Sequence, residues 1–497
     1  GIADKTGSKS YLIYVADRGA EVDFMRNEST LAVNNLGYTL SGDFTSPTGT
    51  IYALSLPASE NAPDAAAIKA NEKTEKYEFR ATGETFQFTN SNEADYNVYY
   101  FLENVNGDHQ SEVYEKSVKT VAISTKAEFE NMLISNDNET IYLLQNDIDL
   151  GGSVTTTDTA FVGVFNGMGH KIHNAEIKKT QTDDKVRTGL FRLVKGGSIM
   201  NITFEDIVIE DTMGKAERTG IIAVMRGGYL GNIKVHNCDV TGIARVGALV
   251  GQILTESSDG FNTSIIDRIS VTSDKDESGN YLHKVYATNQ RAGAVIGYIQ
   301  AGDAAYHNIV YVSNCFVDTY IQTDTSYCGG VLGRCDDRNA KDYLEITNCL
   351  FIGALKSPLH CGGIVGGISG TGKSRIFSCV GNGTMVYSKE FILLESAEKN
   401  CSNIVGNCGS NADAIVRNCF AKFDEYNSNF NVTTFGAYDD NTETYAPQIT
   451  QPTFWMENMT SYTTSLLQFC SAKWDFENVW ELVSDSTLLE SPYVRLK

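Results

Sequence analysis

A short glycine-containing phrase recurs seven times after residue 188 of this 497-residue chain, at intervals of 27 to 46 residues. Units of this size cannot bury an apolar face alone, so each one has to stack on its neighbours. The copies are GLFRL from Gly189, GIIAV from Gly220, GALVG from Gly247, GAVIG from Gly293, GGVLG from Gly329, GGIVG from Gly362 and SNIVG from Ser402.

A second phrase follows most of these copies and ends in cysteine. It occurs at Cys238, Cys315, Cys349, Cys379 and Cys419. The repeat has no 3.6-residue apolar period, which argues against helical and leucine-rich repeats. Two short β phrases per unit instead predict a right-handed parallel β-helix, in which equivalent residues of successive coils form columns. We expect the five cysteines of the second phrase to form one such column.

Other cysteines also predict columns. Cys328, Cys361 and Cys401 each stand directly before a glycine phrase in three successive repeats. In a further column cysteine alternates with isoleucine, at Ile253, Ile299, Cys335, Ile368 and Cys408. This exchange indicates inward, apolar positions where a thiol acts as a small hydrophobe. We interpret the columns as free buried thiols; disulfides and metal ligation are the alternatives.

The segment GISGTGKS, from Gly367 to Ser374, matches the phosphate-binding P-loop pattern. A working P-loop connects a strand to a helix whose N-terminus faces the phosphates. The residues after Lys373 read SRIFSCV, which the repeat assigns to another strand. We therefore predict no nucleotide binding and expect Gly367, Gly370 and Gly372 to be turn residues at a corner.

The chain before the repeats has a different pattern. Residues 10–120 contain alternating segments such as SYLIYVA, EKYEFRA and DYNVYYFLENVNGDHQSEVYEKSV, which predict an antiparallel sandwich. This part resembles the Ig-like or fibronectin-type-III-like modules of bacterial surface proteins, with the last segment as the final hairpin. Residues 121–135 predict a short helix with Ser124 at its N-cap and Phe129, Met132 and Leu133 on one face. A long apolar strand, IYLLQNDIDL, follows.

The phrases FVGVFNGMGHKIHNAEI, GLFRLVKGGSIMNITFEDIVI and GALVG followed by SNC resemble the GLUG-type repeats of bacterial surface proteins. The resemblance covers about residues 121–497. It implies a pectin-lyase-like right-handed β-helix on a secreted or cell-envelope protein, with a role in adhesion or glycan interaction. It implies no defined catalytic set; the H-E-x-x-H motif of the family's zinc proteases is absent. GIIAV and GLFRL lack the last glycine of the phrase.

The predicted fold is therefore all-β. An N-terminal Ig-like β-sandwich precedes a right-handed parallel β-helix solenoid with a C-terminal cap. We expect a tag remnant or linker at residues 1–9, the sandwich at 10–120, the β-helix at 121–450 and the cap at 451–497. The tryptophans Trp455, Trp474 and Trp480 are expected to seal the last coil; the alternative is a sugar-binding platform.

Candidate chemistry is confined to two stretches. In GRCDDRN, Asp336 and Asp337 could act as acid and base or bind Ca²⁺, with Arg334 and Arg338 gripping a uronate carboxylate. The alternative is a solvated turn with compensating charges. In SDKDESGN, Asp274 and Asp276 are candidate Ca²⁺ ligands, although Val285 at the twelfth position excludes an EF-hand.

We otherwise expect no cofactor and no metal. The seven histidines are scattered and form no recognisable catalytic set.

The formal charge of −22 argues against a nucleic-acid partner, and no apolar run is long enough to span a membrane. We expect a secreted or cell-surface bacterial protein whose export signal has been removed. Three functions remain open: non-catalytic binding of an extracellular glycan or host protein, a polysaccharide lyase or glycoside hydrolase, and a structural stalk.

Overall fold

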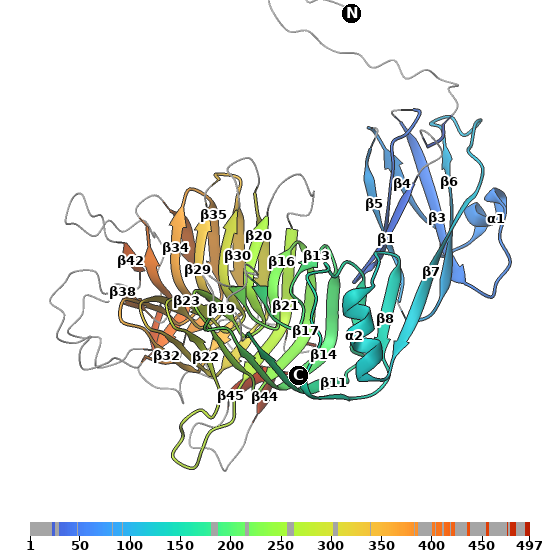
Figure 1. Cartoon of the computed structure of the whole chain (residues 1–497). Helices are drawn as coiled ribbons and strands as arrows, with labels where there is room; N and C mark the ends of the chain where they lie inside the picture. Colours follow the sequence, from blue (N-terminus) through green and yellow to red (C-terminus); the bar gives the residue numbers. More distant parts are fainter. Residues whose placement is uncertain are drawn as a thin grey trace, which may run out of the picture. The chain divides into compact units, whose positions relative to one another are not determined.

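The computed structural model divides the chain into two compact units, Gly1–Val121 with Asp137–Tyr142, and Ala122–Asn136 with Leu143–Lys497. The chain is all-β, with short helices and, in the second unit, parallel sheets (Figure 1). The structure describes residues 22–24, 29–46, 48–81, 83–91, 93–179, 187–213, 218–255, 263–301, 307–337, 339–381, 383–385, 400–402, 404–409, 412–417, 419–422, 435–437, 454–456, 475, 478–483 and 493–497.

The first unit contains two antiparallel sheets. One joins β1 (Thr30–Asn34), β2 (Gly37–Ser41) and β5 (Thr85–Thr89). The other has the order β4 (Glu75–Phe79), β3 (Gly49–Pro57), β6 (Tyr96–Glu103) and β7 (Tyr114–Ile123). The predicted strand in EKYEFRA and the predicted final hairpin are confirmed as β4 and β6–β7. The predicted strand SYLIYVA lies outside the described residues.

Aromatic side chains form the core between these two sheets. The rings of Phe44 and Phe79 stack with their centroids 4.3 Å apart, and Tyr38 lies 6.1 Å from Tyr96. A short helix, α1 (Ala65–Ala70), interrupts the strands and begins at the N-cap Asp64, whose side chain accepts a hydrogen bond from Ala67 N.

The predicted helix after residue 121 is confirmed as α2 (Lys126–Ile134), with Phe129, Met132 and Leu133 buried. Its predicted N-cap is wrong by one residue, because Thr125 rather than Ser124 caps it. The Thr125 side chain accepts from Glu128 N, and the Glu128 carboxylate accepts from Thr125 N at 2.9 Å and Ser124 N at 2.8 Å. This reciprocal capping box fixes the start of the helix.

The second unit contains three sets of parallel strands, which we call sheets I, II and III. Successive strands of each sheet come from successive repeats and lie side by side in colour order (Figure 1). Sheet I comprises β12 (Arg187–Thr188), β15 (Arg218–Thr219), β19 (Arg245–Gly247), β23 (Gln290–Gly293), β28 (Ser326–Gly329), β33 (His360–Gly362) and β38 (Asn400–Ser402). Sheet II comprises β13 (Val194–Lys195), β16 (Ile222–Arg226), β20 (Val250–Thr255), β24 (Ile296–Ala301), β29 (Leu332–Asp337), β34 (Val365–Gly370), β39 (Val405–Cys408) and β42 (Phe435–Ala437).

Sheet III is the largest of the three. It comprises β8 (Thr140–Leu144), β9 (Ile148–Ser153), β10 (Val164–Asn166), β11 (Lys171–Lys178), β14 (Ser198–Glu210), β17 (Gly228–His236), β18 (Asp239–Gly242), β21 (Thr263–Thr272), β22 (Lys284–Ala287), β25 (Ile309–Ser313), β26 (Phe316–Asp318), β27 (Tyr320–Thr323), β30 (Tyr343–Thr347), β31 (Leu350–Phe351), β32 (Ala354–Lys356), β35 (Lys373–Phe377), β36 (Val380–Gly381), β37 (Thr384–Met385), β40 (Asp413–Arg417), β41 (Phe420–Lys422) and β43 (Phe454–Met456). The segment IYLLQNDIDL therefore forms two strands, β8 and β9, rather than the single strand predicted. The antiparallel pair β44 (Trp480–Val483) and β45 (Tyr493–Leu496) is separate.

Two of the predicted cysteine columns are confirmed. Cys361 pairs in register with Cys328 on one side and with Cys401 on the other. The mixed column is Ile253, Ile299, Cys335, Ile368 and Cys408. All nine cysteines whose side chains are described are buried and carry free thiols.

The third predicted column is wrong in one member. Cys315, Cys349, Cys379 and Cys419 align along sheet III. Cys238 instead aligns with Ile207. The reason is that the chain bends at two kinds of left-handed corner, and an asparagine can occupy either one: Asn314 has φ 54° and Asn237 has φ 52°.

The glycines of the repeated phrase stand where the chain turns from sheet I to sheet II. A Cβ on Gly247, Gly293, Gly329 or Gly362 would lie 2.0, 2.2, 1.9 or 1.8 Å from the carbonyl oxygen three residues later. Only glycine allows this close approach. In GIIAV the fourth residue, Ala223, takes the place of the last glycine, because Ile222 pairs with Val250 and Ala223 then lies opposite Gly251.

The P-loop-like segment contains two strands. Lys373 and Ser374 open β35, so the prediction that a strand follows is confirmed. Gly370 has φ 98° and is a turn residue as expected. The expectation for Gly367 is wrong, because this residue lies inside β34; a Cβ there would be 2.6 Å from Cδ1 of the Tyr327 ring. An aromatic ring therefore accounts for this glycine.

Most of the expected cap lies outside the described residues, including Trp474. Trp455 lies in β43, parallel to β41. Trp480 is fully buried, and its Nε1 donates to Asn314 Oδ1 at 3.3 Å. Asn314 belongs to a middle repeat, so the expectation that Trp480 covers the last coil is wrong. Across the described part of the chain, no helix is long and apolar enough to cross a membrane.

Candidate functional site

The outer side of sheet I carries a column of arginines. Arg187 pairs with Arg218 and Arg218 with Arg245, and the pairing of Val246 with Ala292 sets Arg245 opposite Arg291. The same column continues with Tyr327 and His360. The next residue along each strand is buried, so these side chains alternate outward. We call Arg187, Arg218, Arg245, Arg291, Tyr327 and His360 the outer column.

A second column on sheet II lies against the outer column. Gln252, Tyr298, Arg334 and Gly367 follow one another in register there. The Tyr298 ring lies between two guanidinium groups, with Arg291 4.4 Å and Arg245 5.5 Å from its centroid. These distances are those of cation–π contacts.

Tyr327 makes an equivalent stack one repeat further along. The Arg334 guanidinium is 4.3 Å from the Tyr327 centroid, and the His360 ring centroid is 4.7 Å away. Gly367 leaves room for the ring beside the backbone. The His360 Nε2 contacts Asn407 Nδ2 at 3.3 Å. Burial, together with the Arg334 charge, lowers the pKa of His360 to about 4, so this ring is neutral at pH 7.

Two residues of the stacks have a left-handed backbone. Arg291 has φ 65° and Tyr327 has φ 62°, in the left-handed region that large side chains rarely adopt. Such conformations cost on the order of 1–3 kcal/mol each and persist only where the surroundings impose them. Both residues support the two stacks, so the strain serves to direct these side chains outward.

The charges of the stacks are only partly compensated. Asp336 accepts hydrogen bonds from the Tyr298 hydroxyl at 2.9 Å and from Ser369 Oγ at 2.8 Å. Arg334 Nη2 donates to Ser369 Oγ at 3.0 Å and lies 3.9 Å from Asp336 Oδ1. Arg291 forms no ion pair with any described residue, and its Nε is a buried donor without an acceptor among them. Burial lowers the pKa of Arg291, and the Arg334 and Arg245 charges act in the same direction.

The structure places the residues predicted from the sequence as follows. Arg334 and Asp336 lie on the outer face of β29, in contact with the two stacks. Asp337 ends β29 opposite Gly370, and its side chain is outside the description. Arg338 is not among the described residues.

The arginines of the outer column were not predicted. A signal was nevertheless present, because the residue two positions before the glycine phrase is arginine in four successive repeats. It reads RTG at Arg187, RTG at Arg218, RVG at Arg245 and RAG at Arg291, then YCG at Tyr327 and HCG at His360.

The carboxylates of the predicted Ca²⁺ loop take part in hydrogen bonds within the protein. Asp276 Oδ1 accepts hydrogen bonds from Ser278 N at 2.9 Å and Asn280 N at 2.8 Å, and Oδ2 accepts from Asn280 Nδ2 at 3.0 Å. Asp274 exchanges hydrogen bonds with Asn237. The two carboxylates therefore hold the loop by themselves. No group of three or more His, Cys, Asp or Glu side chains in the described part of the chain could hold a metal ion.

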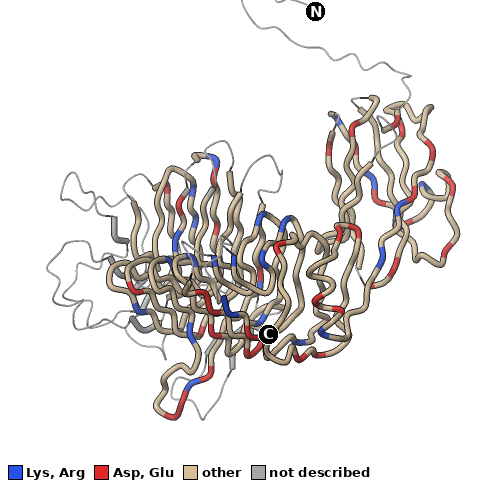
Figure 2. The backbone as a smooth tube through the Cα atoms, viewed as in Figure 1, with Lys and Arg blue, Asp and Glu red and all other residues tan. Residues whose placement is uncertain are grey.

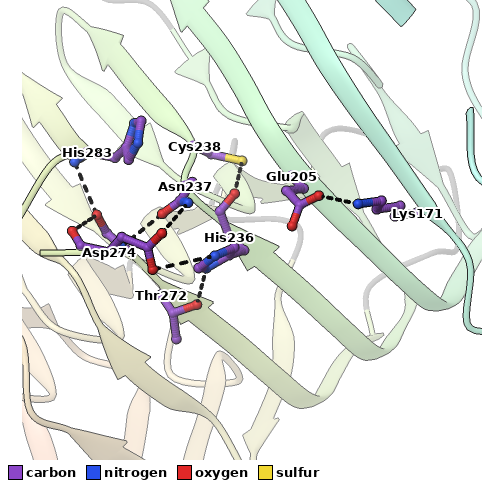
Figure 3. A network of polar contacts seen from close by, with 9 residues as sticks. Lys171, Glu205, His236, Asn237, Cys238, Thr272, Asp274 and His283 are labelled. Carbon is purple, nitrogen blue, oxygen red and sulfur yellow. Dashed lines mark hydrogen bonds and ion pairs between the residues drawn. The ribbon is translucent and has the colours of Figure 1, made fainter. Parts of the chain in front are cut away.

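Figure 3 shows how this loop is fixed to the repeats. Asn237 and His236, at the end of β17, contact Asp274, and His236 Nδ1 also contacts Thr272 Oγ1 at 2.9 Å. On the other side of the loop, His283 Nδ1 lies 2.9 Å from Asp239 Oδ2. The side chains of Asn237, Asp274 and His283 are thus engaged within this network.

Comparisons with known proteins give limited similarity. No family model matches the chain. The chain is 34% identical over 118 residues to halomucin of Haloquadratum walsbyi, a match that spans 22% of this chain and 1% of halomucin. A solved structure from Bacteroides ovatus, named "putative immunoglobulin A1 protease", is similar with a TM-score of 0.43 and 15% identity; it covers 73% of this chain and 90% of that chain.

Proposed function

We propose that the chain is an extracellular, non-catalytic glycan-binding protein whose second unit is a right-handed parallel β-helix of GLUG-type repeats. The register of sheets I to III supports the β-helix, since each strand pairs with its equivalent in the next repeat. The resemblance to bacterial surface proteins and the 118-residue similarity to halomucin support a location outside the cell. The first unit acts as an Ig-like spacer.

The observation that carries the proposal is the pair of cation–aromatic stacks on sheets I and II. Tyr298 and Tyr327 hold flat guanidinium groups of Arg245, Arg291 and Arg334 at fixed positions. A guanidinium offers several N–H donors in one plane and pairs well with adjacent oxygens. A row of such groups in successive repeats suits a long ligand rich in oxygen, which a polysaccharide is.

The stacks explain binding better than glycoside hydrolysis. Catalysis by paired carboxylates needs a second acid at a set distance from the first. Among the described residues, the carboxylate that contacts the stacks is that of Asp336, which accepts hydrogen bonds from Tyr298 and Ser369. We expect incubation with a panel of plant and bacterial polysaccharides to release neither reducing ends nor unsaturated uronates. Product release that disappears in Asp336→Asn would refute the non-catalytic assignment.

Binding is tested with immobilised polysaccharides, neutral and acidic, against the wild type and Tyr327→Asn. Asparagine tolerates the left-handed backbone but removes the ring that holds Arg334. A cation–π contact of about 0.5–2 kcal/mol corresponds to about 3- to 30-fold weaker binding. The matched control is Tyr311→Asn, because Tyr311 is an outward tyrosine of sheet III, 39% exposed. Equal affinities of the two variants for every ligand would contradict the assigned site.

A further inference from the structure

The two stacks bring positively charged side chains close together on an acidic chain. Acidic residues outnumber basic ones by 62 to 40, and acidic and basic segments alternate along both units (Figure 2). Around Tyr298, however, the guanidinium groups of Arg245 and Arg291 contact the same ring, and Arg291 forms no ion pair with any described residue.

This proximity of like charges is unfavourable in the free protein. Neighbouring strands of a sheet are about 4.8 Å apart, so Arg245 and Arg291 hold like charges at short range. Both are half-buried, where screening by water is weaker than at a fully exposed site. Arg291 lacks a counter-ion among the described residues, and the buried Nε atoms of Arg291 and Arg334 have no acceptor there. An anion bound to this face would relieve the repulsion.

The spacing selects a particular kind of anion. Single ions would neutralise one arginine each, whereas the outer column repeats its charge from one repeat to the next. A linear polymer with regularly placed carboxylate or sulfate groups matches such a row, because each group can pair with the planar fork of one guanidinium.

A nucleic acid matches the face less well. Single-stranded nucleic acids bind by stacking bases on open aromatic rings. Here Tyr298 is 1% exposed, and the Tyr327 ring is in contact with both Arg334 and His360, so neither ring offers an open platform to a base.

We infer that the ligand is an acidic polysaccharide, whose carboxylate or sulfate groups pair with Arg245, Arg291 and Arg334 along the outer column. This inference rests on the proposed glycan-binding function and adds the chemical class of the glycan. Arg187 and Arg218 extend the same column and would pair with the next groups of the polymer.

The test compares two arginines with the same backbone. Arg291 and Arg268 have φ 65° and 55°, and both stand on the outer side of the repeats. Arg268 lies on sheet III between Asn232 and Asn314 in register, and its Nε is paired with Asp267 at 3.0 Å. Arg291→Asn and Arg268→Asn therefore remove one charge each and place the same residue in the same conformation, but only Arg291 belongs to the proposed site.

Affinities are measured for polygalacturonate, heparin, neutral dextran and a single-stranded oligothymidylate. We expect tight binding to polygalacturonate or heparin and none to dextran or the oligonucleotide. Binding should weaken as NaCl rises from about 0.05 to 0.5 M. Arg291→Asn should lower the affinity tenfold or more and Arg268→Asn less than twofold. The two acidic polymers decide between carboxylate and sulfate as the preferred group.

Several results would overturn the inference. Binding of dextran as tight as that of the acidic polymers, with Arg291→Asn unchanged, would leave the glycan-binding function intact and refute the acidic ligand. A failure to bind any polysaccharide would refute both, and stronger binding of the oligonucleotide would refute the ligand class. If Arg291→Asn unfolds, Arg291→Lys keeps the charge and loses the planar fork; an affinity equal to the wild type would refute pairing through the guanidinium.

Discussion

The substitution Gly367→Ala tests the link between the repeat and the site. The new Cβ would lie 2.6 Å from Cδ1 and 2.7 Å from Cε1 of the Tyr327 ring. Carbon atoms in contact prefer about 3.5–4.0 Å, so the ring has to move by about 1 Å. Arg334 and His360 cover the ring and limit where it can go.

The cost follows from this geometry. One added methyl in a filled space destabilises by about 1–3 kcal/mol. At about 2–4 °C per kcal/mol for a large domain, the midpoint of thermal unfolding should fall by about 2–12 °C. The displaced ring also releases the Arg334 guanidinium, so the affinity for the best-binding acidic polysaccharide should drop about 3- to 30-fold.

The control is Gly409→Ala. Its Cβ would meet Ser369 at 3.5 Å, an ordinary contact, and its φ needs no glycine. Alanine there should be neutral or stabilising by about 0.4–1 kcal/mol. Scanning calorimetry and affinity electrophoresis on both variants give the two readouts. Indistinguishable midpoints and affinities would show that the Tyr327 ring is not seated on Gly367. Stabilisation of the wild type by ATP, lost in Gly367→Ala, would restore the nucleotide interpretation.

Three further predictions concern stability. The pKa of His360 in the folded protein is about 4, below the ordinary 6.5, so its contribution to stability is complete above pH 6.5 and is lost as the pH falls toward 4. The urea concentrations at the unfolding midpoint at pH 7 and pH 4.5 should therefore differ less for His360→Phe than for the wild type. Burial raises the pKa of Cys238 to about 12 and of Cys408 to about 11, so stability should decline as the pH rises above about 9, and Ellman's reagent should react with these thiols only after unfolding. Thr125→Ala should lower the free energy of unfolding by about 0.5–2 kcal/mol, measured with urea, because the capping box is lost. An equal decrease in Ser124→Ala would show that Ser124 is the N-cap, as predicted from the sequence.

The stacking of repeats could be predicted because its causes are local and recur. Glycine is required wherever the chain turns from sheet I to sheet II, since a Cβ there would collide with a carbonyl oxygen. Cys335 and Ile368 exchange in one column because both fit an apolar interior. The repeated residues therefore predict both where the chain turns and which side chains point into the interior.

Features that depend on register could not be predicted. The turn before Ala223 is one residue shorter than the turn before Gly251, and no residue of the repeated phrase indicates this difference. Asn237 and Asn314 precede cysteines in the same way but bend the chain at different corners. The role of Gly367 depends on Tyr327 in the preceding repeat, 40 residues earlier in the sequence.

The arginines of the outer column show why the site was the least predictable part. Each arginine alone is an ordinary surface residue, and GRCDDRN has a denser cluster of charges. Only the in-register pairing of β19 with β23 brings Arg245 and Arg291 to the same ring. Several corners elsewhere in the repeats use asparagine, which adopts the left-handed conformation readily, whereas Arg291 and Tyr327, like Arg268 on sheet III, adopt it at a cost. At Arg291 this cost coincides with burial and with the nearby like charges of Arg334 and Arg245, which together lower its pKa. The proposed acidic ligand would give this strained, like-charged arrangement a function.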